Sequence, residues 1–274
     1  MRNRKKGSGR GVKCMVLALL ALTPIAVAQE TNSLGMKLVP VPGTKILMAT
    51  TEVTVDQYRA AGLGYDAPKF PQSGNHPAVN VSWNDAKAYC KWLSKKEGKK
   101  YRLPTDREWS CAVGIGNLES VGGSPQSKSG QVADVFPWGR QGKGSPPPKG
   151  AGNYPGQEMR SMSAEMAEKL FLSTYTLIGG YNDGQVFTAP VGSYAASKLG
   201  IHDLGGNASE WCEDIYTPGD PSRVLRGGSW NADYIYGLLY SAHCRDRLMS
   251  SYRNCRGPEL RYDFSGFRVV CEER

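Results

Sequence analysis

The chain has 274 residues, 40% of them hydrophobic, and a formal net charge of +9. Six of its basic residues lie in the first 28 positions without any acid, so the remaining 246 residues carry only +3. That length allows one domain with a sizeable core or, alternatively, two small ones. The charge gives no reason to expect nucleic-acid binding.

The N-terminus has the pattern of a secretory signal peptide over residues 1–28. A basic stretch precedes the apolar run Met15–Leu22, and Ala26-Val27-Ala28 has the small-x-small form of a cleavage site. The run is too short for a spanning helix, and no later run is long and apolar enough to be one. We therefore expect an exported chain, secreted or periplasmic, with no membrane span after cleavage. An uncleaved N-terminal anchor is the alternative.

The positions of the cysteines and histidines limit which metal sites are possible. Six of the seven cysteines follow the signal peptide, and an even number in an exported chain permits disulfides without defining their pairing. None lies in a C-x-x-C pattern, so a zinc ribbon or thioredoxin site is not indicated. The three histidines are scattered and are interpreted as surface or hydrogen-bonded residues: His76, His202 and His243.

Taken in chain order, Lys45–Val53 is predicted to be a strand, and Thr54 caps a short helix to Ala61. Ser82 with Asp85 forms a capping box, and the helix behind it ends at Gly98. Its predicted buried face carries Ala86, Tyr89, Cys90 and Leu93.

A second capping box, Thr105 with Glu108, starts a short helix through Ala112. Residues 114–152 form a long Gly/Ser/Pro-rich loop, and 163–172 have helical spacing. Thr188–Val191 is predicted to be an edge strand because it contains proline. Strand-like runs at 224–225 and 267–270 bracket a long irregular segment. These elements predict an irregular α+β domain.

Several strings together resemble the formylglycine-generating enzyme, or sulfatase-modifying factor, family. Over roughly residues 34–271 they are Glu52–Tyr58, Val81–Ala86, Tyr101–Trp109, Phe136–Gly139, Thr188–Val191, Leu204–Trp211, Arg226–Trp230 and Gly266–Arg268. The resemblance implies one domain over 29–274 with a variant of the C-type-lectin fold. Such a fold has a small antiparallel sheet, two helices and long loops.

The resemblance also implies an activity, the copper-dependent oxidation of a sulfatase cysteine to formylglycine, with a sulfatase as partner. The family holds Cu(I) with two thiolates placed shortly after the Gly-Gly-Ser-aromatic string, and a soft cuprous ion requires such a pair. Here Ala232 stands at the first position. Cys244 is near the second, but Tyr240 occupies its partner position.

Other oxidase positions match unevenly. Ser229 matches the serine of the family's oxygen pocket, whereas Ser209 replaces the pocket tryptophan. Cys244 and Cys255 are eleven residues apart and do not reproduce the family's thiol spacing. The oxidase activity is therefore predicted to be lost, and if it persists Ser229, Cys244 and Cys255 are its candidate catalytic residues.

The resemblance further implies two structural calcium ions, whose hard oxygen ligands mix carboxylates and carbonyls. The first set corresponds to Asn153, Tyr154, Asp183 and Gln185. The second corresponds to Asp203, Gly206, Ala208 and Glu210, and we favour it of the two. The alternative is that Asp203 and Glu210 merely cap turns.

Family disulfides transfer only in part. The resemblance implies Cys90–Cys271, since Cys271 lies two residues beyond the family position and on the same strand face. Cys111 corresponds to a cysteine that pairs into the variable segment, here with Cys244 or Cys255. Cys212 is interpreted as a buried free thiol.

We favour a non-catalytic ligand-binding or regulatory function that uses the segment between Gly-Gly-Ser-Trp and Gly-Phe-Arg. This segment is rich in the residue types of adaptable binding loops. The partner is an unknown protein, peptide or glycan, and the alternatives are a copper oxidase or an ordinary hydrated loop. The candidate ligand-binding residues are Tyr234, Tyr236, Tyr240, Asn254, Arg256, Tyr262, Asp263 and Phe264.

Overall fold

The computed structural model describes residues 29–142, 145–169, 177–231 and 247–273. Several predictions therefore lie outside the described residues. These are the signal peptide, the last positions of the helix expected over 163–172, and Ala232, Tyr234, Tyr236, Tyr240, His243 and Cys244.

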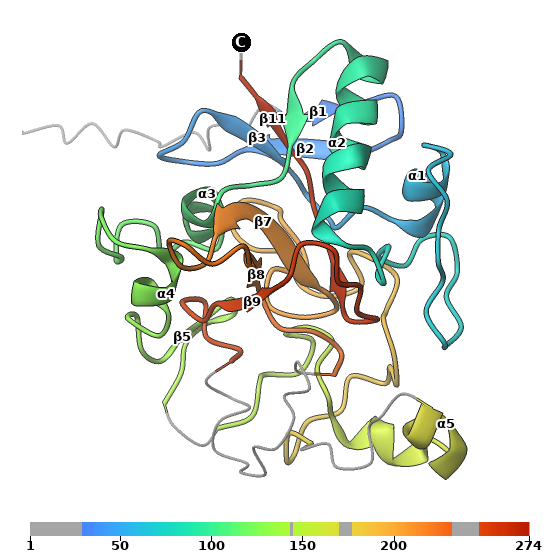
Figure 1. Cartoon of the computed structure of the whole chain (residues 1–274). Coiled ribbons are helices and arrows are strands. Elements are labelled where there is room, and N and C mark those ends of the chain that lie inside the picture. The colour runs from blue at the N-terminus through green and yellow to red at the C-terminus, as the bar shows by residue number, and fades with distance from the viewer. Residues whose placement is uncertain (1–28, 143–144, 170–176, 232–246, 274) are drawn as a thin grey trace, which may run out of the picture.

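One sheet joins the beginning and the end of the domain (Figure 1). Its strands, in spatial order, are β1 (Glu30–Thr31), β2 (Lys37–Pro40), β3 (Ile46–Ala49), β11 (Val270–Glu272) and β4 (Tyr101–Arg102). All neighbours are antiparallel, and β11 places Val270 opposite Met48 and Arg102. The C-terminal strand is therefore inserted between N-terminal ones.

The three capped helices predicted from the sequence are confirmed. Reciprocal capping boxes start α1 (Val55–Arg59), α2 (Trp83–Glu97) and α3 (Asp106–Ala112). The left-handed Gly98 ends α2. The predicted apolar face of α2 is buried and packs in one cluster with residues of the five-stranded sheet: Ala86, Tyr89, Cys90 and Leu93.

A second sheet occupies the middle of the molecule in Figure 1. Its order is β10 (Ser265–Gly266), β7 (Ser209–Ile215), β8 (Arg223–Arg226) and β9 (Asn254–Arg256). The pair β10–β7 is parallel and the other pairs are antiparallel. A small hairpin, β5 (Val135–Phe136) with β6 (Gly139–Arg140), lies in the predicted long loop. The described sheets are thus more numerous than the single antiparallel sheet expected.

The edge strand predicted at Thr188–Val191 is wrong, since these residues form no strand. The amide of Ala189 donates to the side-chain Oδ1 of Asn207 (2.8 Å), and the amide of Val191 donates to the carbonyl of Asn75 (2.9 Å). Pro190 has no amide proton. A buried side chain therefore satisfies the backbone where a strand ladder was expected.

The strand predicted over 267–270 is wrong for residues 267–269, which form no strand and lie between the two sheets. Residues 265–266 before them belong to β10, and 270–272 belong to β11. Between them, the carbonyls of Phe267 and Val269 accept hydrogen bonds from the amides of Val53 and Ala49 (both 2.9 Å). This crossing links the two sheets.

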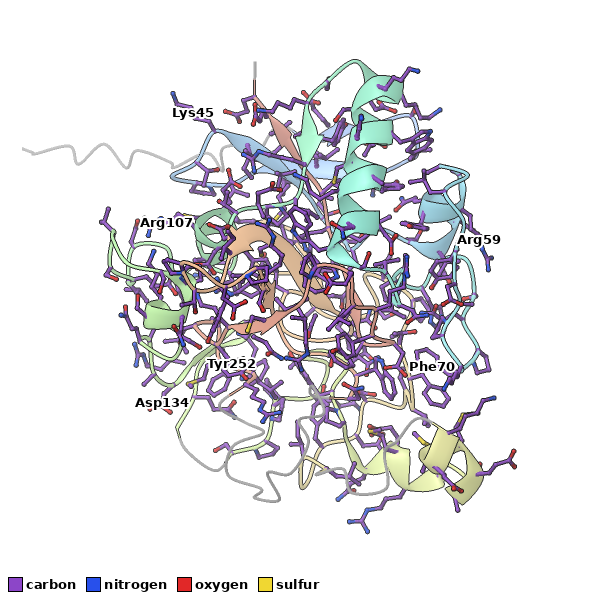
Figure 2. All side chains as sticks on the ribbon, viewed as in Figure 1. Lys45, Arg59, Phe70, Arg107, Asp134 and Tyr252 are labelled. Atoms are coloured by element: carbon purple, nitrogen blue, oxygen red, sulfur yellow. The ribbon has the colours of Figure 1, made fainter. Side chains whose placement is uncertain are left out.

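Short helices cover the remaining loops. They are α4 (Pro125–Lys128), the 3₁₀ helix η1 (Gln157–Ser161) and α5 (Ala164–Lys169). Methionines around η1 and α5 pack toward an aromatic cluster that contains Phe70, Trp230 and Phe264. Figure 2 shows Phe70 on the side of the molecule that carries α5. Trp230 thereby connects the second sheet to this satellite core.

Candidate functional site

Two arginines from the C-terminal half are buried against α3. Arg226 donates to the Asp106 carboxylate, to Ser110 Oγ (3.0 Å) and to the Ser250 carbonyl (2.8 Å). Arg253 holds the same carboxylate through Nε (2.9 Å) and Nη2 (3.0 Å), and reaches Glu119 Oε2 at 2.8 Å. Burial alone would raise the pKa of Asp106, but the two guanidinium charges outweigh it and lower that pKa. This network fixes β8 and the chain before β9 to α3.

A third buried arginine, Arg268, forms a bidentate pair with Glu210 on β7, at 2.6 and 2.7 Å. Trp109 Nε1 also donates to Glu210 Oε2 (3.0 Å). Burial and the negative charge of Asp203 raise the pKa of nearby Glu52, against the Arg268 charge. Three carboxyl groups therefore surround one guanidinium in this part of the core.

The second predicted calcium set meets this cluster. Asp203 is 6% exposed; its Oδ2 accepts from the Gly192 amide (2.7 Å), and its Oδ1 has no partner. The Gly206 carbonyl accepts from the Ala208 amide (2.9 Å). Both oxygens of Glu210 are engaged by Arg268 and Trp109. Only Asp203 thus offers a vacant side-chain oxygen, and this set fits calcium less well than expected.

The first predicted calcium set comes together across two loops. Asp183 accepts from the amides of Tyr154 (2.8 Å) and Gln185 (2.9 Å). Asn153 is fully buried; its Nδ2 donates to the Phe187 carbonyl (2.7 Å), and its Oδ1 has no partner. Asn153 thus has an orphaned amide oxygen and directly precedes the amide that binds the Asp183 carboxylate; such oxygens suit a hard cation, so these residues fit calcium better than the second set.

Burial raises the pKa of Asp183 to about 7, although two amide hydrogen bonds oppose the rise. The negative charge of Glu158 adds to it. No group of three or more His, Cys, Asp or Glu side chains in the described ranges is arranged to hold a metal ion. The first calcium set contains one carboxylate and otherwise amide and carbonyl oxygens, so it would not form such a group, and its fit to calcium depends on the contacts described above.

The oxidase positions are only partly assembled. Ser229 is fully buried, and its hydroxyl hydrogen-bonds to Asn231 Oδ1 (3.0 Å). Cys255 lies on β9 opposite Val224. Ser229 follows Val224 by five positions and lies beyond the Arg226 end of β8. The register of β8 with β9 thus places Cys255 toward the end of β8 away from Ser229.

The five described cysteines carry free thiols: Cys90, Cys111, Cys212, Cys255 and Cys271. Cys90 and Cys271 lie in the same hydrophobic cluster, and burial raises the pKa of the Cys90 thiol to about 12. Cys212 is buried with Trp109 in another cluster. Disulfide formation remains a prediction for these residues.

The described part of the candidate binding loop forms an aromatic ladder. The Arg256 guanidinium lies 5.3 Å from the ring centroid of Tyr262, which stacks on Phe264 at 5.0 Å and 26°. Asn254 Oδ1 accepts from Arg256 Nη1 (2.7 Å). Phe264 is buried in the satellite core, whereas Arg256 and Tyr262 are half-buried. We call Arg256, Tyr262 and Phe264 the aromatic ladder.

Asp263 lies beside the ladder. Burial raises the pKa of its carboxyl to about 6, against the positive charge of Lys69. Its carbonyl accepts from Trp230 Nε1 (3.0 Å), which ties it to the Gly-Gly-Ser-Trp segment. Of the predicted binding residues, those described therefore lie around one surface feature, with Phe264 and Asn254 as its supports.

A separate cavity of about 650 Å³ lies between the end of α3, the β5–β6 hairpin and the loop 195–205. Phe136, Trp138 and Leu199 give it an apolar lining, and Cys111 and Asp203 also contribute to its walls. This cavity was not predictable from the sequence, since its walls come from segments far apart along the chain.

Sequence reasoning also missed Glu52, Glu158 and Asn207. Asn207 donates to Glu52 Oε1 (3.2 Å), and its Oδ1 accepts from Asn153 (3.3 Å). Glu52 and Asn207 lie inside matched strings, but no spacing rule distinguishes them from turn-capping residues. Glu158 lies in a stretch without any recognised pattern. No helix in the described ranges combines the length and apolarity needed to cross a bilayer.

This two-sheet α+β architecture, closed by the Gly-Gly-Ser-Trp and Gly-Phe-Arg segments, defines a domain of the formylglycine-generating type. The chain belongs to the family of the sulfatase-modifying factor enzyme 1-like domain, whose family model matches residues 30–273. The resemblance and fold class predicted from the sequence are thereby confirmed.

Relatives include active and inactive proteins. The formylglycine-generating enzyme of Thermomonospora curvata is 27% identical over 254 residues, covering 84% of this chain and 69% of the relative. The inactive C-alpha-formylglycine-generating enzyme 2 of Bos taurus is 31% identical over 210 residues, covering 74% of this chain and 54% of the relative. This chain thus spans about half of that bovine protein's length.

Among solved structures, PvdO from Pseudomonas aeruginosa superposes with a TM-score of 0.52 at 23% identity, covering 83% of this chain and 80% of that one. This similarity supports the fold alone.

Proposed function

We propose that this chain is an exported ligand-binding or regulatory member of the family and not a copper oxidase. The aromatic ladder is the observation that carries the proposal. Its outer members, Arg256 and Tyr262, are half-buried, and its inner member Phe264 is anchored in the core. A pre-ordered Arg–Tyr surface loses little conformational entropy on binding.

The charges beside the ladder define what it presents. Arg256 offers a guanidinium held in place by Asn254, Tyr262 offers a ring face and a hydroxyl, and Asp263 offers a carboxyl. Such a mixture suits a polar ligand with hydrogen-bonding groups of both kinds, such as a peptide or a glycan.

The thiol positions argue against the oxidase alternative. Copper(I) needs two thiolates at one point, and Cys255 faces Val224 rather than the Ser229 end of β8. Ser209, at the position of the family's pocket tryptophan, is buried and donates to the Gly227 carbonyl (3.3 Å).

Calcium is the structural ion in this proposal. Asn153 and Asp183 would hold it with backbone carbonyls, and a divalent charge there would stabilise loops that have few strands of their own. The pattern of residues 1–28 supports secretion or periplasmic export.

The binding test compares two matched pairs of side chains. Arrays of immobilised glycans and peptides are probed with the wild type, with R256A/Y262A, and with R59A/Y65A. Arg59 lies 5.4 Å from the Tyr65 ring, so the second variant removes a similar pair elsewhere on the surface. We expect R256A/Y262A to lose binding at least tenfold and R59A/Y65A to retain it.

The oxidase test uses the same preparation. Reduced protein is titrated with Cu(I) and then incubated under oxygen with a peptide that carries a sulfatase cysteine motif. Conversion of that cysteine to formylglycine, analysed by mass spectrometry, would replace the binding proposal with the oxidase alternative.

A further inference from the structure

The segments 153–158 and 178–185 lie side by side. The amide of Gln157 donates to the Tyr181 carbonyl (2.8 Å), and the amide of Ile178 donates to the Pro155 carbonyl (2.8 Å). Together with the bond from Tyr154 to Asp183, these contacts bring η1 against the loop that carries Asp183. Glu158, in the first turn of η1, is therefore near Asp183, although no resemblance assigns it a function.

Within the described residues, neither carboxylate has a cationic partner. Asp183 there accepts hydrogen bonds from the backbone amides of Tyr154 and Gln185. Glu158 Oε1 accepts from the Gly156 amide (2.7 Å), and its Oε2 is buried without any partner. Neither residue forms an ion pair with another described residue. Both carboxylates therefore lack a counter-charge among the described residues, and a bound cation would supply one.

Asn153 supplies a further oxygen. Its side chain is fully buried, and its Nδ2 is occupied by the carbonyl of Phe187 and by Asn207. The Oδ1 atom is left without a hydrogen bond. An unpaired buried amide oxygen costs free energy unless a cation or a donor completes it. Carboxylate, amide and carbonyl oxygens on irregular loops are the ligands of calcium.

We propose that Glu158 is an additional carboxylate ligand of a calcium ion bound between Asn153 and Asp183. This goes beyond the positions implied by the family resemblance, and it rests on the calcium part of the proposed function. A second carboxylate neutralises the divalent charge, and ligand charge count is what tunes calcium affinity.

The test is a calcium titration of the chelator-treated mature protein by calorimetry. E158Q removes the charge but keeps an oxygen that can accept the Gly156 amide, so the local fold is preserved. E165Q is the control, because Glu165 is an exposed acid in the first turn of α5. Tyrosine-sensitised terbium luminescence gives a second readout, since Tyr154 and Tyr181 come from the two segments that form the site.

We expect E158Q to lower the affinity for one calcium ion by roughly tenfold or more and to reduce the terbium signal, and we expect E165Q to leave both unchanged. Wild-type affinity in E158Q would overturn the assignment of Glu158. The variant D183N distinguishes the assignment of Glu158 from the existence of the calcium site. If D183N loses the ion and E158Q does not, the calcium site stands without Glu158. If neither variant changes it, the site at these loops is wrong, while the ligand-binding proposal remains under its own test.

Discussion

Asp106 is a residue whose loss the structure predicts to be costly. It is 3% exposed, and its carboxylate accepts hydrogen bonds from both Arg226 and Arg253. The substitution D106N keeps the shape but removes the charge that two buried guanidinium groups share. Breaking a buried ion pair by removing one partner costs about 3–5 kcal/mol, because the remaining charge is left uncompensated.

The expected effect is large enough to measure in two ways. Urea unfolding is expected to show a free energy of unfolding lower by about 3–5 kcal/mol. In thermal unfolding, each kcal/mol corresponds to about 2–4 °C for a domain of this size, so Tm is expected to fall by about 6–20 °C. D220N is the control, since Asp220 is exposed and accepts only from Ser222. We expect no measurable change for it.

Asp106 is also expected to make the stability of the fold depend on pH. The pKa of Asp106 is lower in the folded chain than in the unfolded one, so its contribution is fully present above about pH 4 and is lost as pH falls further. The difference between wild type and D106N is therefore expected to shrink in acid. A D106N cost below about 1 kcal/mol at neutral pH, or a cost that grows in acid, would show that the network does not stabilise the fold as argued.

Three further outcomes are expected. In calcium-free buffer, the raised pKa of Asp183 makes the free energy of unfolding fall as pH rises from about 4 to about 7, and urea titrations of D183N are expected to lose this slope. In oxidised protein, non-reducing peptide mapping is expected to recover Cys90 linked to Cys271, because the two share a core cluster. The substitution C90A is then expected to lower the free energy of unfolding by about 2–5 kcal/mol. Recovery of both cysteines as alkylated thiols would contradict the pairing. G227A is expected to lower the stability of the fold by at least about 1 kcal/mol more than G219A does. Both glycines have a positive φ, but only at Gly227 would an added Cβ meet a carbonyl oxygen, at 2.9 Å. Equal shifts in Tm for the two variants would refute this.

The helices were the most predictable part of the fold. Ser82 and Thr105 start helices through boxes that are local in sequence, so their partners lie three residues away. The family strings likewise predicted the fold class, since they record many positions together. Strand pairing was harder to predict from the sequence, because β11 pairs with β3 although more than two hundred residues separate them.

Thr188–Val191 shows why the strand prediction failed. Composition alone favoured an extended edge, but the partner of its backbone is the side chain of Asn207, and no local rule anticipates that bond. The same limit applies to the candidate site. Asp183 was identified from a matched string, whereas Glu158 becomes visible only when η1 packs beside that loop.

The buried arginines explain how this scaffold can persist when its oxidase positions change. Arg226, Arg253 and Arg268 come from the C-terminal third, and each pairs with an acid on another segment. None of these pairs uses Ser209 or Ser229. Replacement of the family's pocket tryptophan by Ser209 therefore leaves these ion pairs in place, and the same framework carries the aromatic ladder. The buried ion pairs are therefore independent of the two residues that correspond to the family's oxygen pocket, so a change at those two positions removes no ion pair from the scaffold.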